Sequence, residues 1–466
     1  MSLIIFLVLR SMQDFLRYAL LASLASASCN VTGVWQSVGV DDPVMVVESA
    51  DSSFLATATN GWSNVSGRVF ANSTLFLNCC RPGGIFGVIN LQCTLIQWDD
   101  GVGSQWKRPL SRNTTISNIV PRVDDTGEIL RVQDGCLSNF DGVYYLYGAR
   151  YQCCPVDEQP GCYQSCGWRN TTFAVYSSRD LETWHLESDN IFPIISAPGP
   201  HSNAQNAYFE PCVLYSKSSD HYALWFLLEF TKGVAVSDSP TGPFESVSWD
   251  VGLQQGSDSY FWLDQNDPAG TVFVKHNGPP PVGETRGAHY VSQLSPDLLS
   301  FVPNKTSSAM MVPALPVPPA YQGSWPSCSE GGGIFAVDGR WFVMAAACCC
   351  FCHNGANAFV WVSDSGPLGP YYLQNSTSSW GGIGDIMPFN KTTGQYLTGA
   401  QQFSVAPLTL ADGRILPLYI GQRFGSADDG LKCHDYQYWA PLNVSADGIV
   451  SELSWLNDFT VELEVV

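Results

Sequence analysis

Five segments of the chain repeat one plan, and this repeat restricts the fold more than any other feature of the sequence. Each segment begins with a polar residue, continues with a short apolar strand and an acidic or glycine turn, and ends with a strand rich in aromatic residues. The segments span residues 133–151, 210–230, 258–277, 330–347 and 401–421. Asp-Gly and similar pairs between the two runs are typical of hairpin turns.

A third strand and a similar corner follow four of the five segments. The corners read VYSSRDLETW, VAVSDSPTGPF, YVSQLSPDLLSF and VWVSDSGPLGPY. A unit of strand, turn, strand, loop, strand and corner is one blade of a β-propeller. Aromatic residues make up 12% of the chain and helical periodicity is scarce. The sequence therefore predicts an all-β protein whose main domain is a five-bladed β-propeller.

The polar residue at the start of each repeat is the candidate functional residue. These residues precede their hairpin turns by eight to eleven positions and are Gln133, Glu210, Asp258, Glu330 and Gln401. Because the first strand of a blade lines the central channel, similar offsets are expected to bring the five side chains to one height around the axis. Converging polar and acidic side chains are typical of a binding site. The alternative, that they only cap strand ends, would not predict a Glu, Gln or Asp in every blade.

The N-terminus, residues 1–28, is expected to be a cleaved secretory signal. Residues 15–29 read FLRYALLASLASASC, with Arg17 before a short apolar core and small residues before Cys29. Met12 is an alternative start. The competing interpretation is a membrane anchor, but each apolar stretch is shorter than the roughly 20 residues that a membrane span needs.

Cysteines and glycosylation motifs agree with secretion. The chain has 16 cysteines and 14% charged residues, which suits an oxidising compartment where disulfides persist. Asn-x-Ser/Thr motifs, which can carry glycans, occur at nine positions: Asn30, Asn64, Asn72, Asn113, Asn170, Asn304, Asn375, Asn390 and Asn443. We therefore expect a secreted, extracellular, disulfide-bonded glycoprotein.

The net charge of −20 argues against nucleic acid and anionic membranes as partners, since both attract basic surfaces. No segment after the signal is apolar enough to cross a bilayer. We expect no membrane partner and a monomeric protein.

Four cysteines crowd into residues 348–352, CCCFC, at the end of the second strand of the fourth repeat. The equivalent loop of the first repeat, residues 151–166, reads YQCCPVDEQPGCYQSC and again has paired cysteines. Along a strand Cys348, Cys350 and Cys352 lie on one side and Cys349 on the other, which fits the paired spacing of zinc ligands poorly. We expect separate disulfides that rigidify the rim of the site, with Cys328 as one candidate partner, and neither metal nor cofactor.

The repeats resemble glycoside hydrolase family 43, a family of five-bladed propellers. The resemblance runs from about residue 117 to the C-terminus and is carried by VPRVDDTGEILRVQDGCLSNFDGVYYLYG, YFEPCVLYSK, SEGGGIFAVDGRWFVMAA and AQQFSVAPL. It is strongest for the exo-β-1,3-galactanase branch. The resemblance implies an inverting, exo-acting hydrolase whose partner is a β-galactan polysaccharide or oligosaccharide.

The resemblance also implies roles for residues. Glu330 in CSEGGGIF matches the general acid, and Gln401 in GAQQFSV matches the glutamine that holds the attacking water in this branch. Most of the family uses an aspartate of the first blade as general base. Gln133 stands at the expected position, with Asp134 beside it, and we expect both residues, like Asp258, to contact the substrate.

Glu210 in YFEPCVLY approximates the Glu-Arg-Pro-Lys motif of the branch, although an ungapped match aligns Phe209 with its glutamate. A general acid must stay protonated at the working pH, and a neighbouring carboxylate achieves this by like-charge repulsion. Glu210 and Asp258 are candidates for that neighbour. Aromatic rings can stack on sugar faces, and the candidates are Trp225, Trp262, Trp341, Tyr436 and Trp439.

Residues 29–115 lie outside the resemblance. Their short apolar runs and Gly and Asn turns predict a small disulfide-linked β-module that either binds carbohydrate or is purely structural. The expected division is a signal at 1–28, this module at 29–115 and the propeller at 116–466. Two rival functions stay open: an α-L-arabinofuranosidase or β-xylosidase of the same family, and a propeller that binds glycans without cleaving them.

Overall fold

The computed structural model describes the strands of residues 33–107 and residues 110–465 apart from 156–170, 194–207, 229–230, 254–257, 265–266, 268, 285–286, 314–328, 348–352 and 379–381. Contacts divide the chain into a unit made of Met1–Asn113, Thr409–Arg414 and Glu462–Val466 and a larger unit made of the remaining residues. The described part of the chain holds no α-helix, only the 3-10 turn η3 (Lys432–His434). It accordingly contains no helix that could span a bilayer.

Eight strands of the smaller unit form a closed antiparallel barrel in which β1 pairs with β8. They are β1 (Gly33–Ser37), β2 (Pro43–Glu48), β3 (Ser53–Ala58), β4 (Val65–Val69), β5 (Thr74–Asn78), β6 (Ile85–Ile89), β7 (Leu95–Trp98) and β8 (Gln105–Lys107). Closure leaves no free sheet edge. The β-rich N-terminal module predicted from the sequence is thus a barrel, and its side chains lie outside the described residues.

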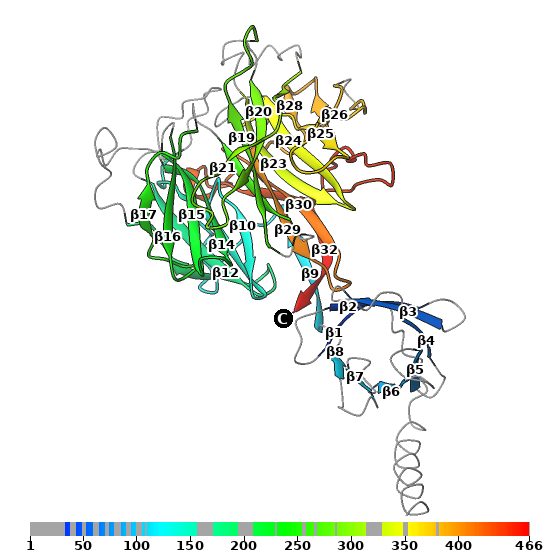
Figure 1. Ribbon diagram of the computed structural model, residues 1–466. Coiled ribbons are helices and arrows are strands. Elements are labelled where there is room, and N and C mark those ends of the chain that lie inside the picture. The colour runs from blue at the N-terminus through cyan, green and yellow to red at the C-terminus, as the bar shows by residue number, and fades with distance from the viewer. Residues whose placement is uncertain are drawn as a thin grey trace, which may run out of the picture. The chain divides into compact units, whose positions relative to one another are not determined.

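Five antiparallel sheets, one for each sequence repeat, make up most of the described part of the larger unit (Figure 1). Blade one contains β10 (Leu137–Phe140), β11 (Val143–Arg150), β12 (Thr172–Ser178) and β13 (His185–Ser188). Blade two contains β14 (Tyr208–Ser216), β15 (His221–Leu228), β16 (Thr231–Ser237) and β17 (Glu245–Ser248). Blade three contains β18 (Ser259–Leu263), β19 (Val272–Gly278), β20 (Ala288–Leu294), β21 (Phe301–Thr306) and the short β22 (Met310–Met311). Blade four contains β23 (Ser329–Val337), β24 (Arg340–Ala347), β25 (Phe359–Ser363) and β26 (Tyr372–Leu373).

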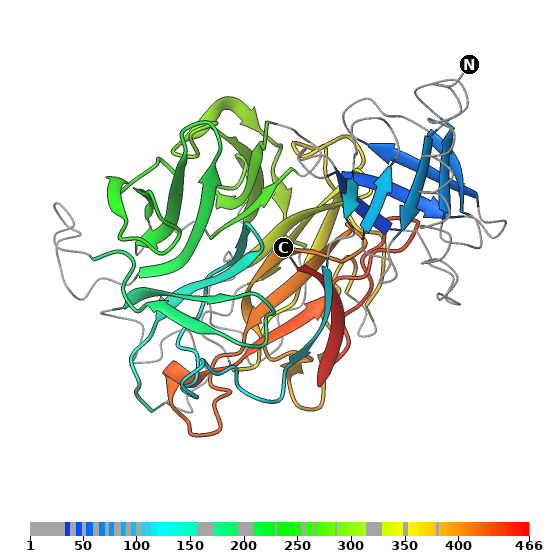
Figure 2. The same ribbon diagram turned by 90° about the horizontal axis from the view of Figure 1, so that it is seen from below.

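Blade five has three strands, β29 (Gln401–Thr409), β30 (Ile415–Gln422) and β31 (Gln437–Pro441), and a small hairpin of β27 (Phe389–Asn390) and β28 (Gln395–Tyr396) precedes it. Asn118 pairs with the outer edge of β31, because its side-chain amide donates to the carbonyl oxygen of Trp439 and its Oδ1 accepts from the N–H of Trp439, both at 2.8 Å. Figures 1 and 2 show β9 (Leu110–Ser117, cyan) beside β32 (Asp458–Val465, red), with which it pairs. The predicted boundary at residue 115 therefore falls inside a paired strand.

The hairpin turns follow from their Asp-Gly pairs. Asp141 and Gly142 have φ values of 51° and 76°, and Asp338 and Gly339 have 50° and 80°. Positive φ at both central residues is the geometry of a two-residue type I′ turn, which suits the twist of the flanking strands. The predicted hairpins of blades one and four are confirmed.

Contacts between the innermost segments of neighbouring blades close the ring. The Cys136–Cys212 disulfide joins blades one and two, and the Ser259 N–H donates to Glu210 at 3.2 Å between blades two and three. The Gly331 N–H donates to Asp258 at 2.6 Å between blades three and four, and Gln401 donates to Glu330 at 2.9 Å between blades four and five. Ser404 Oγ donates to the Gly135 carbonyl oxygen at 3.3 Å between blades five and one. Three of these five contacts involve a residue that the sequence repeats single out. The predicted five-bladed propeller is confirmed, and its centre is rich in polar contacts.

Candidate active site

Four of the five polar residues that begin the repeats meet at the centre of the propeller. The Gln401 side-chain amide donates to Glu330 Oε2 at 2.9 Å. Asp258 hydrogen-bonds the Glu210 carboxyl and interacts electrostatically with Glu330. The structure thus brings Glu210, Asp258, Glu330 and Gln401 together, as their similar offsets from the hairpin turns predict.

Gln133 is the exception. Its amide donates to the carbonyl oxygen of Lys432 at 2.7 Å, and its buried Oε1 has no hydrogen-bond partner among the described residues. Its neighbour Asp134 instead interacts with Glu210 and Glu330 and accepts a long hydrogen bond, 3.4 Å, from the Tyr151 hydroxyl. The prediction that Gln133 faces the site is wrong; blade one contributes Asp134. We call Asp134, Glu210, Asp258 and Glu330 the carboxylate cluster.

A β-bulge explains this shift of one residue. In blades one, two and four the innermost segment pairs with the second strand at Gln133–Ala149, Phe209–Leu227 and Glu330–Ala346. In each blade two residues then stand opposite one: Asp134-Gly135, Glu210-Pro211 and Gly331-Gly332. A bulge bends the strand and redirects side chains, and it is common next to active sites.

The first bulge residue has a left-handed backbone in all three blades. Its φ is 57° at Asp134, 52° at Glu210 and 65° at Gly331. This conformation is uncommon for residues other than glycine and clusters at functional sites. Blades one and two therefore present the bulge residue itself, whereas blade four presents the preceding residue, Glu330. Phe209 thus holds in blade two the place in the strand that Glu330 holds in blade four.

Burial and like charge change the acidity of the cluster. The pKa of Asp134 is raised well above its ordinary value of 3.8, mainly by desolvation and secondly by the nearby Glu210 carboxylate. Desolvation, Glu210 and Glu330 raise the pKa of Asp258 in the same direction. Neighbouring carboxyls that cannot all ionise hold shared protons near neutral pH. The cluster is thus able to donate a proton.

Two fully buried lysines, neither of which the repeat pattern predicts, accompany the carboxylates. Lys232 forms an ion pair with Glu210 at 3.0 Å, and Lys275 donates to the Gly331 carbonyl oxygen at 2.5 Å. Desolvation lowers the pKa of Lys275 to about 8. A signal was present, because each lysine lies within a strand at the edge of its apolar run, in TKGVAVS and VFVKHNG. A lysine is rarely fully buried unless it is paired.

The aromatic predictions fail where the rings belong to the core. Trp225, Trp262, Trp341 and Trp439 are at most 4% exposed. Trp262 packs edge-on against Phe335, and the Arg122 guanidinium lies 4.0 Å above the Trp439 ring. These rings fill the space between blades, where burial of a large aromatic side chain stabilises the fold. Trp262 and Trp439 are therefore not available to stack on a sugar.

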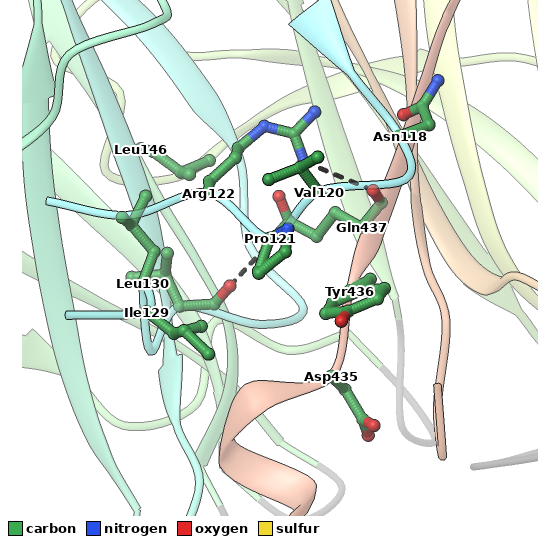
Figure 3. Close-up of a pocket in the computed structure, with 11 residues that line it drawn as sticks. Asn118, Val120, Pro121, Arg122, Ile129, Leu130, Leu146, Asp435, Tyr436 and Gln437 are labelled. Carbon is green, nitrogen blue, oxygen red and sulfur yellow. Dashed lines mark hydrogen bonds between the residues drawn. The ribbon is translucent and has the colours of Figure 1, made fainter. Parts of the chain in front are cut away.

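Tyr436 is half-buried and lines a separate pocket (Figure 3). Arg122, Ile129 and Gln437 share its walls, and Arg122 donates to the Gln437 carbonyl oxygen at 3.3 Å. None of the cluster carboxylates lines this pocket. The structure therefore does not bring Tyr436 into the carboxylate cluster.

A small polar cavity lies beside Asp134. Tyr260, Ser404 and Gln422 contribute to its walls. The buried Tyr260 hydroxyl and Gln422 Oε1 have no hydrogen-bond partner among the described residues. Buried polar atoms of this kind commonly bind ordered water. The cavity is a suitable place for water next to the cluster.

Two disulfides involve blade one. Cys136–Cys212 joins blades one and two directly after their bulges, and Cys153–Cys433 joins the end of blade one to η3. The cysteine-rich segment at 348–352 and its suggested partner Cys328 lie outside the described residues. Within the described part of the chain, the one group of possible metal ligands is Cys153, Cys433 and His434. Its two sulfurs form a disulfide and are not thiolates, which zinc requires.

Comparisons with known proteins extend these observations. No protein-family model matches the sequence, and no curated protein matches it. Solved structures do match. An exo-β-1,3-galactanase from Phanerochaete chrysosporium with galactose has a TM-score of 0.51 and 17% identity, over 75% of this chain and 69% of that chain. A GH43 β-1,3-galactosidase with galactodeoxynojirimycin has a TM-score of 0.50 and 16% identity, over 73% and 99%.

An exo-β-1,3-galactanase from Clostridium thermocellum has a TM-score of 0.50 and 15% identity, over 76% of this chain and 68% of that chain. Identities this low establish architecture. The chain therefore has the five-bladed propeller fold of the GH43 exo-β-1,3-galactanases, as the resemblance of its repeats predicts.

Proposed function

We propose that the protein is a secreted glycoside hydrolase that removes terminal sugars from β-1,3-linked galactan with inversion at the anomeric carbon. One observation carries the proposal: Asp134, Glu210, Asp258 and Glu330 converge at the centre of a propeller, with Gln401 bonded to Glu330. Glycoside cleavage needs one carboxyl that protonates the leaving oxygen and another group that activates water.

Glu330 is our candidate for the general acid. It is half-buried, and it interacts with both Asp134 and Asp258. Repulsion between close carboxylates favours the protonated form that an acid needs.

The geometry supports a different division of labour for Gln401 and Asp134 from the one implied by the family resemblance. Inverting enzymes separate the acid from the group that activates water by about 6.5–9.5 Å, so that water fits on the opposite sugar face. Gln401 is bonded directly to Glu330 at 2.9 Å, which suits an orienting role. Asp134, on blade one beside a water-sized polar cavity, is our candidate for the general base.

Secretion is part of the proposal, and glycan sites support it. Asn113, Asn304, Asn375, Asn390 and Asn443, the sequon asparagines within the described residues, are all exposed. The β-1,3-galactan specificity draws its support from the proteins with similar folds.

The test is a substrate screen with the purified protein. β-1,3-galactan, arabinan and xylan oligomers are incubated separately, and the products are separated by chromatography. We expect galactose from β-1,3-galactan and no product from the other two. Cleavage of arabinan or xylan alone identifies the rival hydrolase, and binding of any oligomer without cleavage identifies a glycan-binding propeller.

A further inference from the structure

Lys275 is a buried cation whose hydrogen bonds go to neutral oxygens. It lies on β19, the second strand of blade three, and its side chain is fully buried. Its ammonium donates to the Gly331 carbonyl oxygen at 2.5 Å and to Asn277 Oδ1 at 2.9 Å. Burying an ammonium is costly unless it is paired and hydrogen-bonded. A site that needed only a counter-charge would place the ammonium on a carboxylate, as Lys232 lies on Glu210.

Blade three holds the Gly331 peptide from both sides. Asp258 Oδ2 accepts the Gly331 N–H at 2.6 Å, while Lys275 donates to the Gly331 carbonyl. The bond from the Lys275 ammonium is charge-assisted, and charge-assisted hydrogen bonds are stronger than neutral ones. Gly331 is the first residue of the blade-four bulge and follows Glu330 directly.

Gly332 leaves room for this contact. Its φ is 140°, and a Cβ there would lie 2.8 Å from Lys275 Nζ and 2.5 Å from the Met344 carbonyl oxygen. A side chain at this position would push the ammonium away from Gly331. The EGGG segment of blade four is therefore matched to a lysine on blade three.

We propose that Lys275 is a positioning residue: by fixing the Gly331 peptide it sets the position of the Glu330 carboxyl. This inference rests on the proposed function, in which Glu330 is the general acid. Catalytic groups must be held within about 0.5 Å of the productive geometry. Gln401 fixes the far end of Glu330 by its hydrogen bond, and Lys275 with Asp258 fixes the backbone end.

The charges around Lys275 define what its removal does. Asp258, Glu210, Glu330 and Lys232 interact with its ammonium, and the ring of Tyr260 lies 5.4 Å from it. Removing this positive charge favours the protonated carboxyls. A general acid nearby then loses its proton at higher pH, so the alkaline limb of the rate profile moves upward.

The experiment compares three variants on the glycan that the parent cleaves. Lys275→Met removes the positive charge and the hydrogen-bond donors while keeping the length of the side chain. We expect kcat to fall about 10²-fold with KM nearly unchanged, which is the effect of a displaced catalytic group. We also expect the alkaline limb of the rate profile to move to higher pH. Asn277→Leu keeps the charge of Lys275 but removes one of its two hydrogen bonds. It should therefore lower kcat and leave the alkaline limb of the rate profile at the same pH. His276→Gln is on the same strand, but its ring bonds Ser292 Oγ and the Asn277 carbonyl oxygen and neither Lys275 nor Gly331, so it should leave both unchanged.

A crystal structure of Lys275→Met gives a readout that needs no activity. We expect the Gly331 peptide to rotate and the Glu330–Gln401 hydrogen bond to break. The inference is overturned if Glu330 stays within about 0.5 Å of its position in the parent. It is also overturned if the parent is active and the kcat of Lys275→Met is lower by less than about twofold, with the alkaline limb of its rate profile at the same pH. Failure of the parent to cleave any glycan refutes the proposed function instead, and the crystal structure still decides the role of Lys275.

Discussion

At the scale of single residues, the proposed chemistry depends on which carboxyl of the cluster carries the proton. Glu330→Gln keeps the shape and the hydrogen bonds of the acid but removes the proton that it donates. We expect the rate on the natural glycan to fall about 10²–10⁴-fold, the usual contribution of acid catalysis. The loss should be much smaller on nitrophenyl glycosides, whose leaving group needs little protonation. Steady-state kinetics on both substrates measure the difference.

The same pair of substrates separates the roles of Gln401 and Asp134. If Gln401 orients the acid, Gln401→Ala should resemble Glu330→Gln. Its rate should then fall more on the natural glycan, which has the poor leaving group, than on nitrophenyl glycosides. Asp134→Asn removes the base, so its loss should be similar for both leaving groups. The reverse assignment holds if Gln401→Ala shows the uniform loss. Near-normal turnover of Glu330→Gln on the natural glycan refutes the assignment of the acid.

Asp258 makes stability depend on pH. Burial and two carboxylates raise its folded-state pKa above 3.8, so the folded protein keeps a proton that the unfolded chain releases. This contribution to stability is complete below about pH 4 and is lost as pH rises through the folded pKa. Asp258→Asn fixes the neutral form while keeping an oxygen for the Gly331 N–H. Between pH 4 and pH 7 the melting temperature of the variant should therefore change less steeply with rising pH than that of the parent. Parallel curves would contradict this account.

Residue types and their spacing predicted Glu210, Asp258, Glu330 and Gln401, because a polar residue at the start of an apolar strand is visible in the sequence. Asp134 was named only as the neighbour of Gln133, to which the repeat pattern assigned the inner start of blade one. A bulge changes which residue turns inward without changing the pattern of apolar residues. Lys275 was missed because its partner, the Gly331 carbonyl, belongs to another blade. The aromatic residues could not be sorted, because core rings and sugar-stacking rings have the same composition.

At the scale of elements, the hairpins were predictable and the bulges were not. Asp141-Gly142 and Asp338-Gly339 specify their turns locally. The bulges at Asp134, Glu210 and Gly331 depend instead on close approaches: a Cβ on Gly135 would lie 2.1 Å from the Tyr147 carbonyl oxygen, and one on Gly333 would lie 2.4 Å from Val405. The first contact forms only once the strands of blade one have paired, and the second only once blades four and five have packed.

The Cys136–Cys212 disulfide ties two of these bulges together. Each cysteine lies two residues after a cluster carboxylate, Asp134 or Glu210. Replacing both cysteines by alanine should lower the free energy of unfolding by about 2–5 kcal/mol, as for other native disulfides, and should also lower kcat. The matched control replaces Cys153 and Cys433, whose bridge lies outside the bulges; it should lose stability and keep kcat. Denaturant unfolding and kinetics on folded protein test the pair. Equal kcat in both variants would refute a link between this disulfide and the site.

At the scale of the whole molecule, every residue of the carboxylate cluster belongs to the larger unit. Removing residues 29–109 keeps β9 and its pairing with β32. We expect this truncated protein to retain hydrolysis of the glycan that the full chain cleaves. Activity is measured after circular dichroism has confirmed a folded product. A soluble, folded truncation without activity would show that the N-terminal barrel is needed for catalysis.

The repeat pattern sufficed for the architecture because each blade is a local unit of hairpin and corner. Five units with polar residues at their inner starts imply a ring with a polar centre. The closed barrel of β1–β8 was predicted only as a small β-module, because its short strands carry no repeat that gives their number.

If the carboxylate cluster hydrolyses a β-1,3-galactosidic bond with inversion, the anomer of the first product reveals it. Proton NMR follows β-1,3-galactan oligomers during the first minutes of reaction, before free galactose mutarotates. We predict α-galactose as the first-formed product with the parent protein and no galactose above background with Glu330→Gln. β-Galactose as the first product, or equal release by parent and variant, would contradict the account.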